Sequence, residues 1–96
     1  WSVSHAASRY ADCARCMDLA QEGDSDEVAC ARLVEGLRAL TADLAVPGPE
    51  EFGITRADWF GAMERMAIQA LESGSPDNNP RIPVAEDIVQ LYTRIW

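Results

Sequence analysis

Three thiols and one imidazole, Cys13, Cys16, Cys30 and His5, are the side chains of this chain best suited to soft-metal or redox chemistry. Cys13 and Cys16 form a CxxC motif. Such a motif works in redox proteins at a helix N-terminus after a strand, where the helix dipole lowers the thiol pKa. Here it falls inside a predicted helix, and no second paired motif completes a tetrahedral zinc site. We interpret the cysteines as small buried thiols and keep a thiolate metal module as an alternative.

The sequence contains no residue pattern suited to acid–base or nucleophilic catalysis. His5 is the only histidine, it lies near the N-terminus, and no Ser or Cys is spaced to use it as a base. The carboxylate pair Glu86-Asp87 falls in the first turn of a predicted helix, where negative charge interacts favourably with the helix dipole. The six glycines are scattered, so no phosphate-binding loop is present. Judged by its own residues, the chain is not an enzyme.

Composition restricts the partners and the compartment. The 96 residues carry a net charge of −8, so nucleic acid and anionic membranes, which attract basic surfaces, are not expected partners. No apolar run reaches the roughly 18 residues that span a bilayer. Three cysteines are an odd count without secretory features, which favours free thiols and a cytoplasmic location. The chain does not begin with Met, and Trp1-Ser2-Val3 is typical of the interior of a longer polypeptide.

Helical periodicity predicts how the first half of the chain is built. A first helix is expected over about residues 8–20, with an apolar stripe. Gly23 interrupts it, and Asp24 with Glu27 three residues later predicts a capping box for a second helix. Pro47 to Pro49 end that helix. The two stripes consist of Tyr10, Cys13, Ala14 and Met17, and of Cys30, Leu33, Val34, Leu37, Leu40 and Leu44.

The second half repeats this organisation. Thr55 with Asp58 predicts the start of a third long helix, and a last helix is expected from about Ala85. Between them lies a turn-dense segment, residues 73–83. The pattern predicts an all-α fold, a bundle of about four main helices forming a single domain over residues 1–96. The predicted stripes are Trp59, Met63, Met66, Ala67, Ala70 and Leu71, then Ile88, Leu91, Tyr92 and Ile95.

Several short motifs follow one another over nearly the whole chain. They are Tyr10-Ala11-Asp12, Ala31-Arg32-Leu33-Val34-Glu35-Gly36-Leu37, Leu44-Ala45-Val46-Pro47, Glu51-Phe52-Gly53-Ile54, Ala57-Asp58-Trp59, Asn79-Pro80-Arg81 and Glu86-Asp87-Ile88-Val89-Gln90-Leu91-Tyr92. In this order and spacing they resemble the C-terminal end of the iron-containing (group III) alcohol dehydrogenases. Each motif alone is weak, whereas the ordered set is fairly specific.

The resemblance implies a larger enzyme of the dehydroquinate synthase-like, iron-type alcohol dehydrogenase fold. Such enzymes join an N-terminal dinucleotide-binding domain to an all-helical C-terminal domain. A divalent metal, Fe(II) or Zn(II), lies between the domains on one Asp and three His, and hydride passes to or from NAD(P). None of these ligands and no cofactor loop matches a position of this chain. We therefore expect a C-terminal fragment that is inactive alone, with no cofactor of its own.

The same resemblance suggests a role for the turn-dense segment. In the family this loop faces the cleft, so Ser75, Asp77 and Asn79 are predicted to line the substrate site, while Pro80 and Arg81 stop one helix and orient the next. Family members usually have Asp where this chain has Ser73, and many have Cys-Thr at Ser75-Pro76. The resemblance therefore does not define the substrate class.

The last helix also departs from the family, because Val84 stands where Thr is usual as N-cap. The loss of a capping side chain should cost on the order of 1 kcal/mol.

Two further expectations concern partners. A helix face that packs on upstream helices in the intact enzyme would be exposed here, so the chain should self-associate or be only marginally stable. The alternative function is a free-standing acidic helical interaction module without catalysis.

Overall fold

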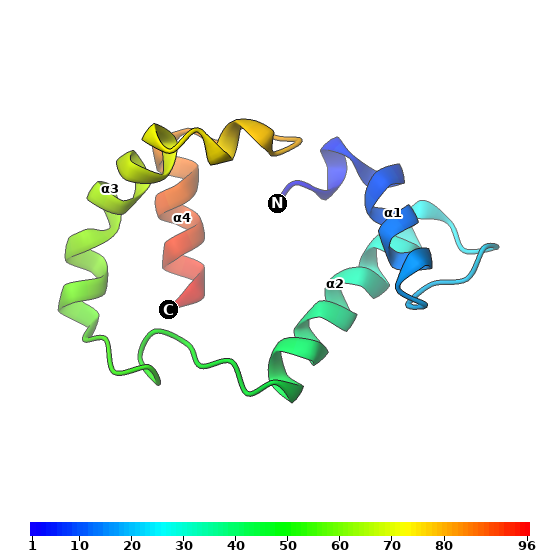
Figure 1. Ribbon diagram of the computed structural model, residues 1–96, viewed down its shortest axis with the longest axis horizontal. Coiled ribbons are helices and arrows are strands. Elements are labelled where there is room, and N and C mark those ends of the chain that lie inside the picture. Colours follow the sequence, from blue (N-terminus) through cyan, green and yellow to red (C-terminus); the bar gives the residue numbers. More distant parts are fainter. The chain divides into compact units, whose positions relative to one another are not determined.

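A computed structural model describes all 96 residues, and every regular element in it is a helix. The all-α prediction is confirmed, and the number of main helices agrees. None of them is long and apolar enough to cross a membrane. The elements are the 3-10 helices η1 (Val3–His5) and η2 (Ser75–Asn78) and the α-helices α1 (Ala7–Cys16), α2 (Asp26–Asp43), α3 (Arg56–Glu72) and α4 (Ala85–Ile95), shown in Figure 1.

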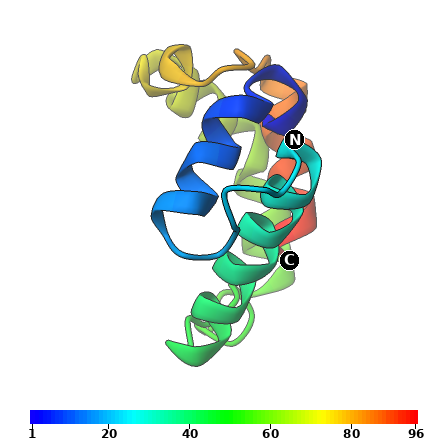
Figure 2. The same ribbon diagram turned by 90° about the vertical axis from the view of Figure 1, so that its right-hand side faces the viewer.

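The helices pack in two pairs, each inside its own compact unit. The N-terminal unit spans Trp1–Val46 and holds η1, α1 and α2, whereas the C-terminal unit spans Pro47–Trp96 and holds α3, η2 and α4. Within each unit the two α-helices lie side by side in both views (Figures 1 and 2).

Small side chains form the contact between α1 and α2. Ala11, Ala14 and Ala29 are fully buried, and Cys30 and Leu33 complete the core of the N-terminal unit. Side chains this small let two helix backbones approach closely, but they bury little apolar area. The core of this unit is therefore tight and thin.

Helix α1 ends one turn earlier than its periodicity predicts, at Cys16 rather than near Ala20. Asp18 takes a left-handed backbone conformation (φ 57°), and the Leu19 N–H donates to the carbonyl of Ala14 over 2.9 Å. This is the hydrogen-bond pattern of a Schellman motif. The predicted stripe is therefore only partly buried. Tyr10 is half-buried and Ala14 is buried, but Cys13 and Met17 are exposed.

Helix α2 is capped by Ser25, so the predicted capping box of Asp24 and Glu27 is wrong. The Ser25 hydroxyl accepts from the Val28 N–H over 3.3 Å. The Asp24 carboxylate instead accepts from the Gln21 N–H at 2.7 Å and from the Arg32 side chain of α2 at 2.6 Å, so it does not cap the first turn of the helix.

Only part of the predicted α2 stripe is covered. Cys30 and Leu33 are buried as expected, whereas the rest of the stripe toward the C-terminus is exposed, because α1 is short and covers only the beginning of α2. The exposed residues are Val34, Leu37, Leu40 and Leu44.

The C-terminal unit follows its predicted pattern closely. Thr55 caps α3 by accepting from the Asp58 N–H at 3.2 Å, which confirms that start. α4 begins at Ala85 as expected. Most of the two predicted stripes are confirmed, with Met63, Ala67 and Ile88 buried and Trp59, Met66, Ala70, Leu71, Leu91 and Tyr92 half-buried. Ile95 is the exception, because it lies in the last turn and is exposed.

Candidate functional site

The segment between α3 and α4, which contains the three predicted cleft-lining residues, is folded rather than extended. Gly74 (φ 71°) ends α3, and η2 follows at once. The Ser75 N–H donates to the Ser73 hydroxyl at 3.3 Å, and the Asp77 N–H donates to the Gly74 carbonyl at 3.2 Å. Hydrogen bonds between residues two or three positions apart stabilise turns that cannot bury apolar area.

The structure places the three predicted residues on one short stretch of this segment. Ser75 and Asp77 are exposed and Asn79 is half-buried. The Asn79 amide donates to the carbonyl of Arg81 across a tight turn. A hydroxyl and a carboxylate thus lie open to solvent beside a structured turn. That they line a substrate cleft remains a prediction.

One carboxylate attaches the end of this segment to α4. Asp87 Oδ2 accepts from the Val84 N–H, and Asp87 Oδ1 accepts from the Arg81 guanidinium, both over 3.1 Å. Val84 is the N-cap residue and has no side-chain oxygen, as the sequence indicates. Sequence reasoning interpreted Asp87 only as a charge favourable to the helix dipole and missed this double contact. The three-residue spacing from Val84 to Asp87, half of a capping box, was the available signal.

The side chains of this segment are of the kind that bind polar ligands. It offers hydroxyl, amide and carboxylate groups, and it contains no histidine or cysteine.

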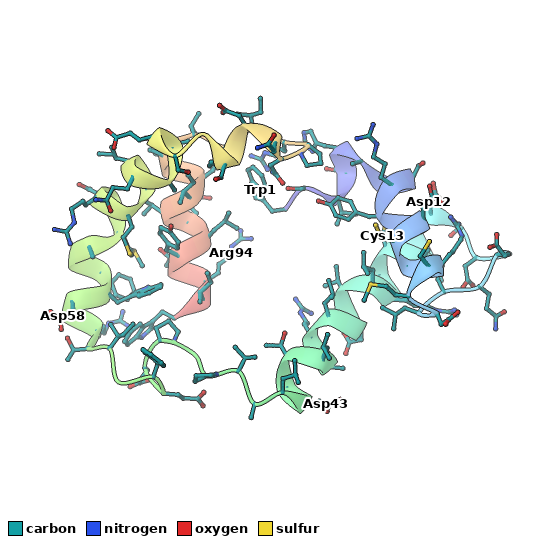
Figure 3. The ribbon with its side chains drawn as sticks, in the orientation of Figure 1. Trp1, Asp12, Cys13, Asp43, Asp58 and Arg94 are labelled. Atoms are coloured by element: carbon teal, nitrogen blue, oxygen red, sulfur yellow. The ribbon has the colours of Figure 1, made fainter.

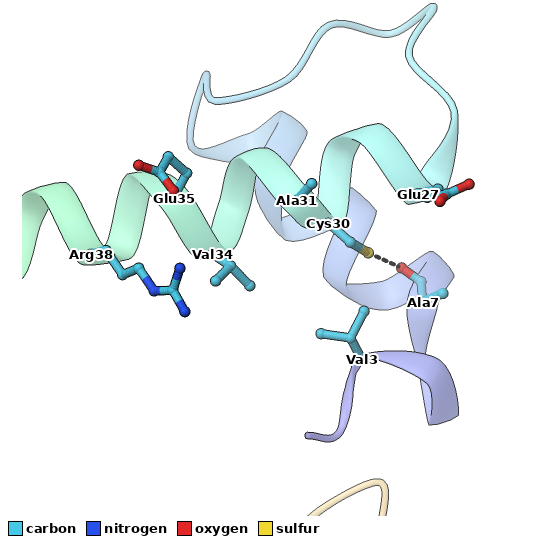
Figure 4. Close-up of a pocket in the computed structure, with 8 residues that line it drawn as sticks. All are labelled: Val3, Ala7, Glu27, Cys30, Ala31, Val34, Glu35 and Arg38. Atoms are coloured by element: carbon cyan, nitrogen blue, oxygen red, sulfur yellow. Dashed lines mark hydrogen bonds between the residues drawn. The ribbon is translucent and has the colours of Figure 1, made fainter. Parts of the chain in front are cut away.

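The three cysteines do not form a site. Cys30 is buried, and its thiol lies 3.2 Å from the carbonyl of Ala7 (Figure 4). Cys16 and Cys13, the latter labelled in Figure 3, are exposed on α1. The interpretation as buried thiols is thus right for Cys30 and wrong for the other two. No group of three or more His, Cys, Asp or Glu side chains is placed to hold a metal ion. The CxxC motif also occupies the C-terminal end of its helix, not the N-terminal position that a redox CxxC motif takes.

A charged cluster around Arg15 ties the two helices of the N-terminal unit to the loop that joins them. The guanidinium donates to Asp12 and Asp26, both at 3.1 Å, and to the carbonyl of Asp24 at 2.9 Å. The hydrogen bond and the charge of Asp26 raise the pKa of Arg15 above its ordinary value. Sequence reasoning missed this cluster, although Asp12 and Arg15 have the i, i+3 spacing of a helical ion pair.

Each unit also has an open apolar groove. In the N-terminal unit a groove of about 610 Å³ lies along η1 and α2 (Figure 4). In the C-terminal unit a groove of about 410 Å³ lies between α3 and α4. The first is lined by Val3, Ala7, Cys30, Ala31 and Val34 with Glu27, Glu35 and Arg38, and the second by Ala67, Ile68, Ala85 and Val89 with Glu64, Glu86 and Gln90.

Comparison with known proteins identifies relatives along the whole chain. Lactaldehyde reductase of Escherichia coli K12 is 32% identical over 97 residues, which cover 100% of this chain and 24% of the relative. The bifunctional aldehyde-alcohol dehydrogenase AdhE of the same strain is 28% identical over 87 residues, which cover 90% of this chain and 10% of AdhE. No family model and no solved structure matches.

Both relatives are members of the iron-containing alcohol dehydrogenase family, so the resemblance read from the motifs is confirmed. The chain spans about a quarter of the length of lactaldehyde reductase and a tenth of that of AdhE. It thus corresponds to one part of much longer proteins.

Proposed function

We propose that this chain, which resembles the iron-containing alcohol dehydrogenases from end to end, is the C-terminal helical part of a metal- and NAD(P)-dependent enzyme of that family. The parent enzyme interconverts short alcohols with aldehydes or ketones in the cytoplasm. The observation that carries the proposal is the match to lactaldehyde reductase along 100% of the chain. The all-helical fold agrees with it.

The catalytic groups belong to the rest of that enzyme. This chain cannot by itself supply the family's ligand set of one Asp and three His, because His5 is its only histidine. A bound metal would supply polarisation of the alcohol or carbonyl oxygen. The metal ligands would lie upstream of this chain, at the cleft between the two domains, and the dinucleotide-binding domain would hold NAD(P). This chain would contribute Ser75, Asp77 and Asn79 to the wall of the substrate cleft.

The test compares the purified 96-residue chain with the natural gene product that contains it. The chain alone should retain no stoichiometric iron or zinc after dialysis and should show no nicotinamide turnover with short alcohols or aldehydes. The complete gene product should show turnover that is lost on chelation and restored by adding metal. Dehydrogenase activity of the isolated chain would refute the assignment of the catalytic groups. A complete gene product without a nucleotide-binding region would refute the family role.

The isolated chain should also self-associate or be only marginally stable. Large apolar side chains are exposed in both units, among them Leu44, Phe52 and Ile82 at 66%, 74% and 64%. Contiguous exposed apolar surface drives association in water. Sedimentation should therefore show an average mass that grows with protein concentration. A stable monomer with no such dependence would contradict this expectation.

The alternative is a free-standing acidic interaction module, which the two apolar grooves and the net charge of −8 favour. The natural reading frame separates the two functions. A start codon near Trp1 supports the module, whereas a frame that continues upstream into a Gly-rich strand–turn–helix unit supports the enzyme.

A further inference from the structure

The shape of the segment from Ser73 to Val84 does not come from core packing. Of its twelve residues only Pro83 is buried, and the apolar side chains of Ile82 and Val84 are 64% and 58% exposed. Segments with little buried apolar area normally open at low free energy. Something other than the hydrophobic core must therefore hold this one in place.

Polar contacts do so at both ends. At the α3 end, η2 is bonded back to Ser73 and Gly74. At the α4 end, the Asp87 carboxylate accepts one hydrogen bond from the Val84 backbone and one from the Arg81 side chain. The Asp87 side chain is 20% exposed and that of Arg81 38%, so this ion pair is partly shielded from water. Charge-assisted bonds of this kind are stronger than bonds between neutral groups.

We propose that Arg81 and Asp87 are positioning residues, which hold the segment with Ser75, Asp77 and Asn79 in its binding shape and thereby set the affinity for the alcohol or carbonyl substrate. The inference rests on the proposed function for the substrate, while the anchoring itself follows from the contacts of these two residues. A segment that is already ordered loses little conformational entropy when a ligand binds. An unanchored segment would lose that entropy when the substrate binds, so the substrate would bind more weakly. Removal of the anchor should therefore change KM rather than kcat.

The first test uses the natural gene product that contains the chain. Asp87→Asn keeps the size of the side chain and removes its charge, and Arg81→Ala removes the donor. Glu86→Gln is the matched control, because Glu86 lies in the same first turn of α4, has the same charge and is exposed without an ion pair. We expect KM for the substrate to rise about three- to ten-fold in the two variants, since ordering one side chain costs about 0.5–1.5 kcal/mol. The value of kcat and KM for the nicotinamide should change less than about two-fold, as should every constant of the control.

The Arg81→Lys variant distinguishes a loss of positioning from a general loss of stability, because only the former should respond to the restored charge. Lysine keeps the charge and loses the planar fork, so it should restore part of the substrate KM. The inference is overturned if Asp87→Asn behaves like Glu86→Gln. It is also overturned if the constants for substrate and nicotinamide worsen together with the melting temperature.

Hydrogen exchange on the same proteins tests the anchoring independently of activity. In Asp87→Asn the amide of Val84 keeps only a neutral acceptor. It should exchange about three- to ten-fold faster, because a hydrogen bond to a charged group contributes about 1 kcal/mol more than one between neutral groups. The amides of Asp77 and Asn79 should follow, whereas those of α2 should not change. Unchanged exchange in the segment would overturn the inference. Absent dehydrogenase activity in the unaltered protein, with faster exchange in the variant, would overturn the proposed function instead.

Discussion

The two units bury their helix pairs by different means. The N-terminal unit joins α1 and α2 through alanines that are fully buried and through the charged cluster around Arg15. The C-terminal unit joins α3 and α4 through larger side chains, with Met63 and Ile88 in the core. Close packing of small residues depends on a narrow helix–helix distance, whereas large side chains can readjust when a neighbour changes. The N-terminal unit should therefore be the more sensitive to added volume.

Aromatic rings close one end of the C-terminal unit. Trp59 meets Tyr92 edge-on, with ring centroids 5.9 Å apart, and its indole N–H donates to the Tyr92 carbonyl at 3.2 Å. Trp96 lies 6.3 Å from Trp59 and 5.9 Å from Phe60, and the Arg56 guanidinium lies 4.4 Å above the Phe60 ring. The N-terminal unit contains only two aromatic residues, Trp1 and Tyr10, against the four of this cluster. Aromatic pairs add about 0.5–1.5 kcal/mol beyond the area that they bury.

The units also differ in how their helices end. α3 ends on Gly74, which takes the left-handed conformation without a steric penalty. α1 and α2 end on Asp18 (φ 57°) and Ala45 (φ 49°), which take the same conformation at a cost of about 1–2 kcal/mol each. The left-handed residues that end helices in the N-terminal unit are thus strained, whereas the left-handed glycine that ends α3 is not.

The largest effect is expected from Leu33→Ala, which removes the only large aliphatic side chain in the core of the N-terminal unit. A buried Leu→Ala change costs about 2–5 kcal/mol. Hydrogen exchange in urea should show amides of α1 and α2 losing protection before those of α3 and α4. Leu40→Ala on the exposed part of α2 is the control and should cost less than about 1 kcal/mol. Equal loss of protection in both units would mean that they unfold as one body.

The next largest effect on stability is expected from a larger side chain in the core of the N-terminal unit. Ala29→Leu inserts a large side chain between α1 and α2, where Ala29 is fully buried. Overpacking typically costs about 1–3 kcal/mol, and thermal unfolding followed by circular dichroism should show it. Ala31→Leu, at an exposed position two residues along the same helix, should change stability by less than about 0.5 kcal/mol. A tolerated Ala29→Leu would show that the α1–α2 spacing is not tight.

Trp59→Phe tests the aromatic cluster of the C-terminal unit. The variant keeps a ring and loses the hydrogen bond to the Tyr92 carbonyl, which should cost about 0.5–1.5 kcal/mol. Near-ultraviolet circular dichroism should weaken, and amides of α4 should exchange faster while those of α1 do not. Phe52→Leu, at a ring that is 74% exposed, serves as control. Unchanged amide exchange in α4 would show that the aromatic cluster does not stabilise this unit.

The smallest effects are expected from substitutions at the residues that end the helices. Ala45→Gly and Asp18→Gly should each stabilise the N-terminal unit by about 0.5–1 kcal/mol, because relief of left-handed strain exceeds the entropy that glycine adds to the unfolded chain. Gly74→Ala should destabilise the C-terminal unit by a similar amount. Gly23→Ala has open space around its Cβ and no positive φ, so it should have little effect. Melting temperatures of the four variants check the set, and a destabilised Ala45→Gly would contradict the argument.

Sequence reasoning predicted most of the secondary structure and part of the site. The helix over residues 56–72 and the start at Ala85 follow from local capping and periodicity, and both are confirmed. The early end of α1 was missed because Asp18 stands where glycine would normally signal a stop. The Asp24 capping box was wrong because the carboxylate binds Arg32, eight residues away, which no local rule reveals.

Local chemistry therefore decided that the chain is helical, how many helices it has and where α3 and α4 begin, because capping and periodicity act over three or four residues. Tertiary contacts decided which side chains are covered. The α2 stripe reads the same from Cys30 to Leu44, yet only its beginning meets α1. They also decided that Asp87 holds Arg81 as well as Val84. Burial and charge pairing depend on neighbours that the spacing of residues along one helix does not specify.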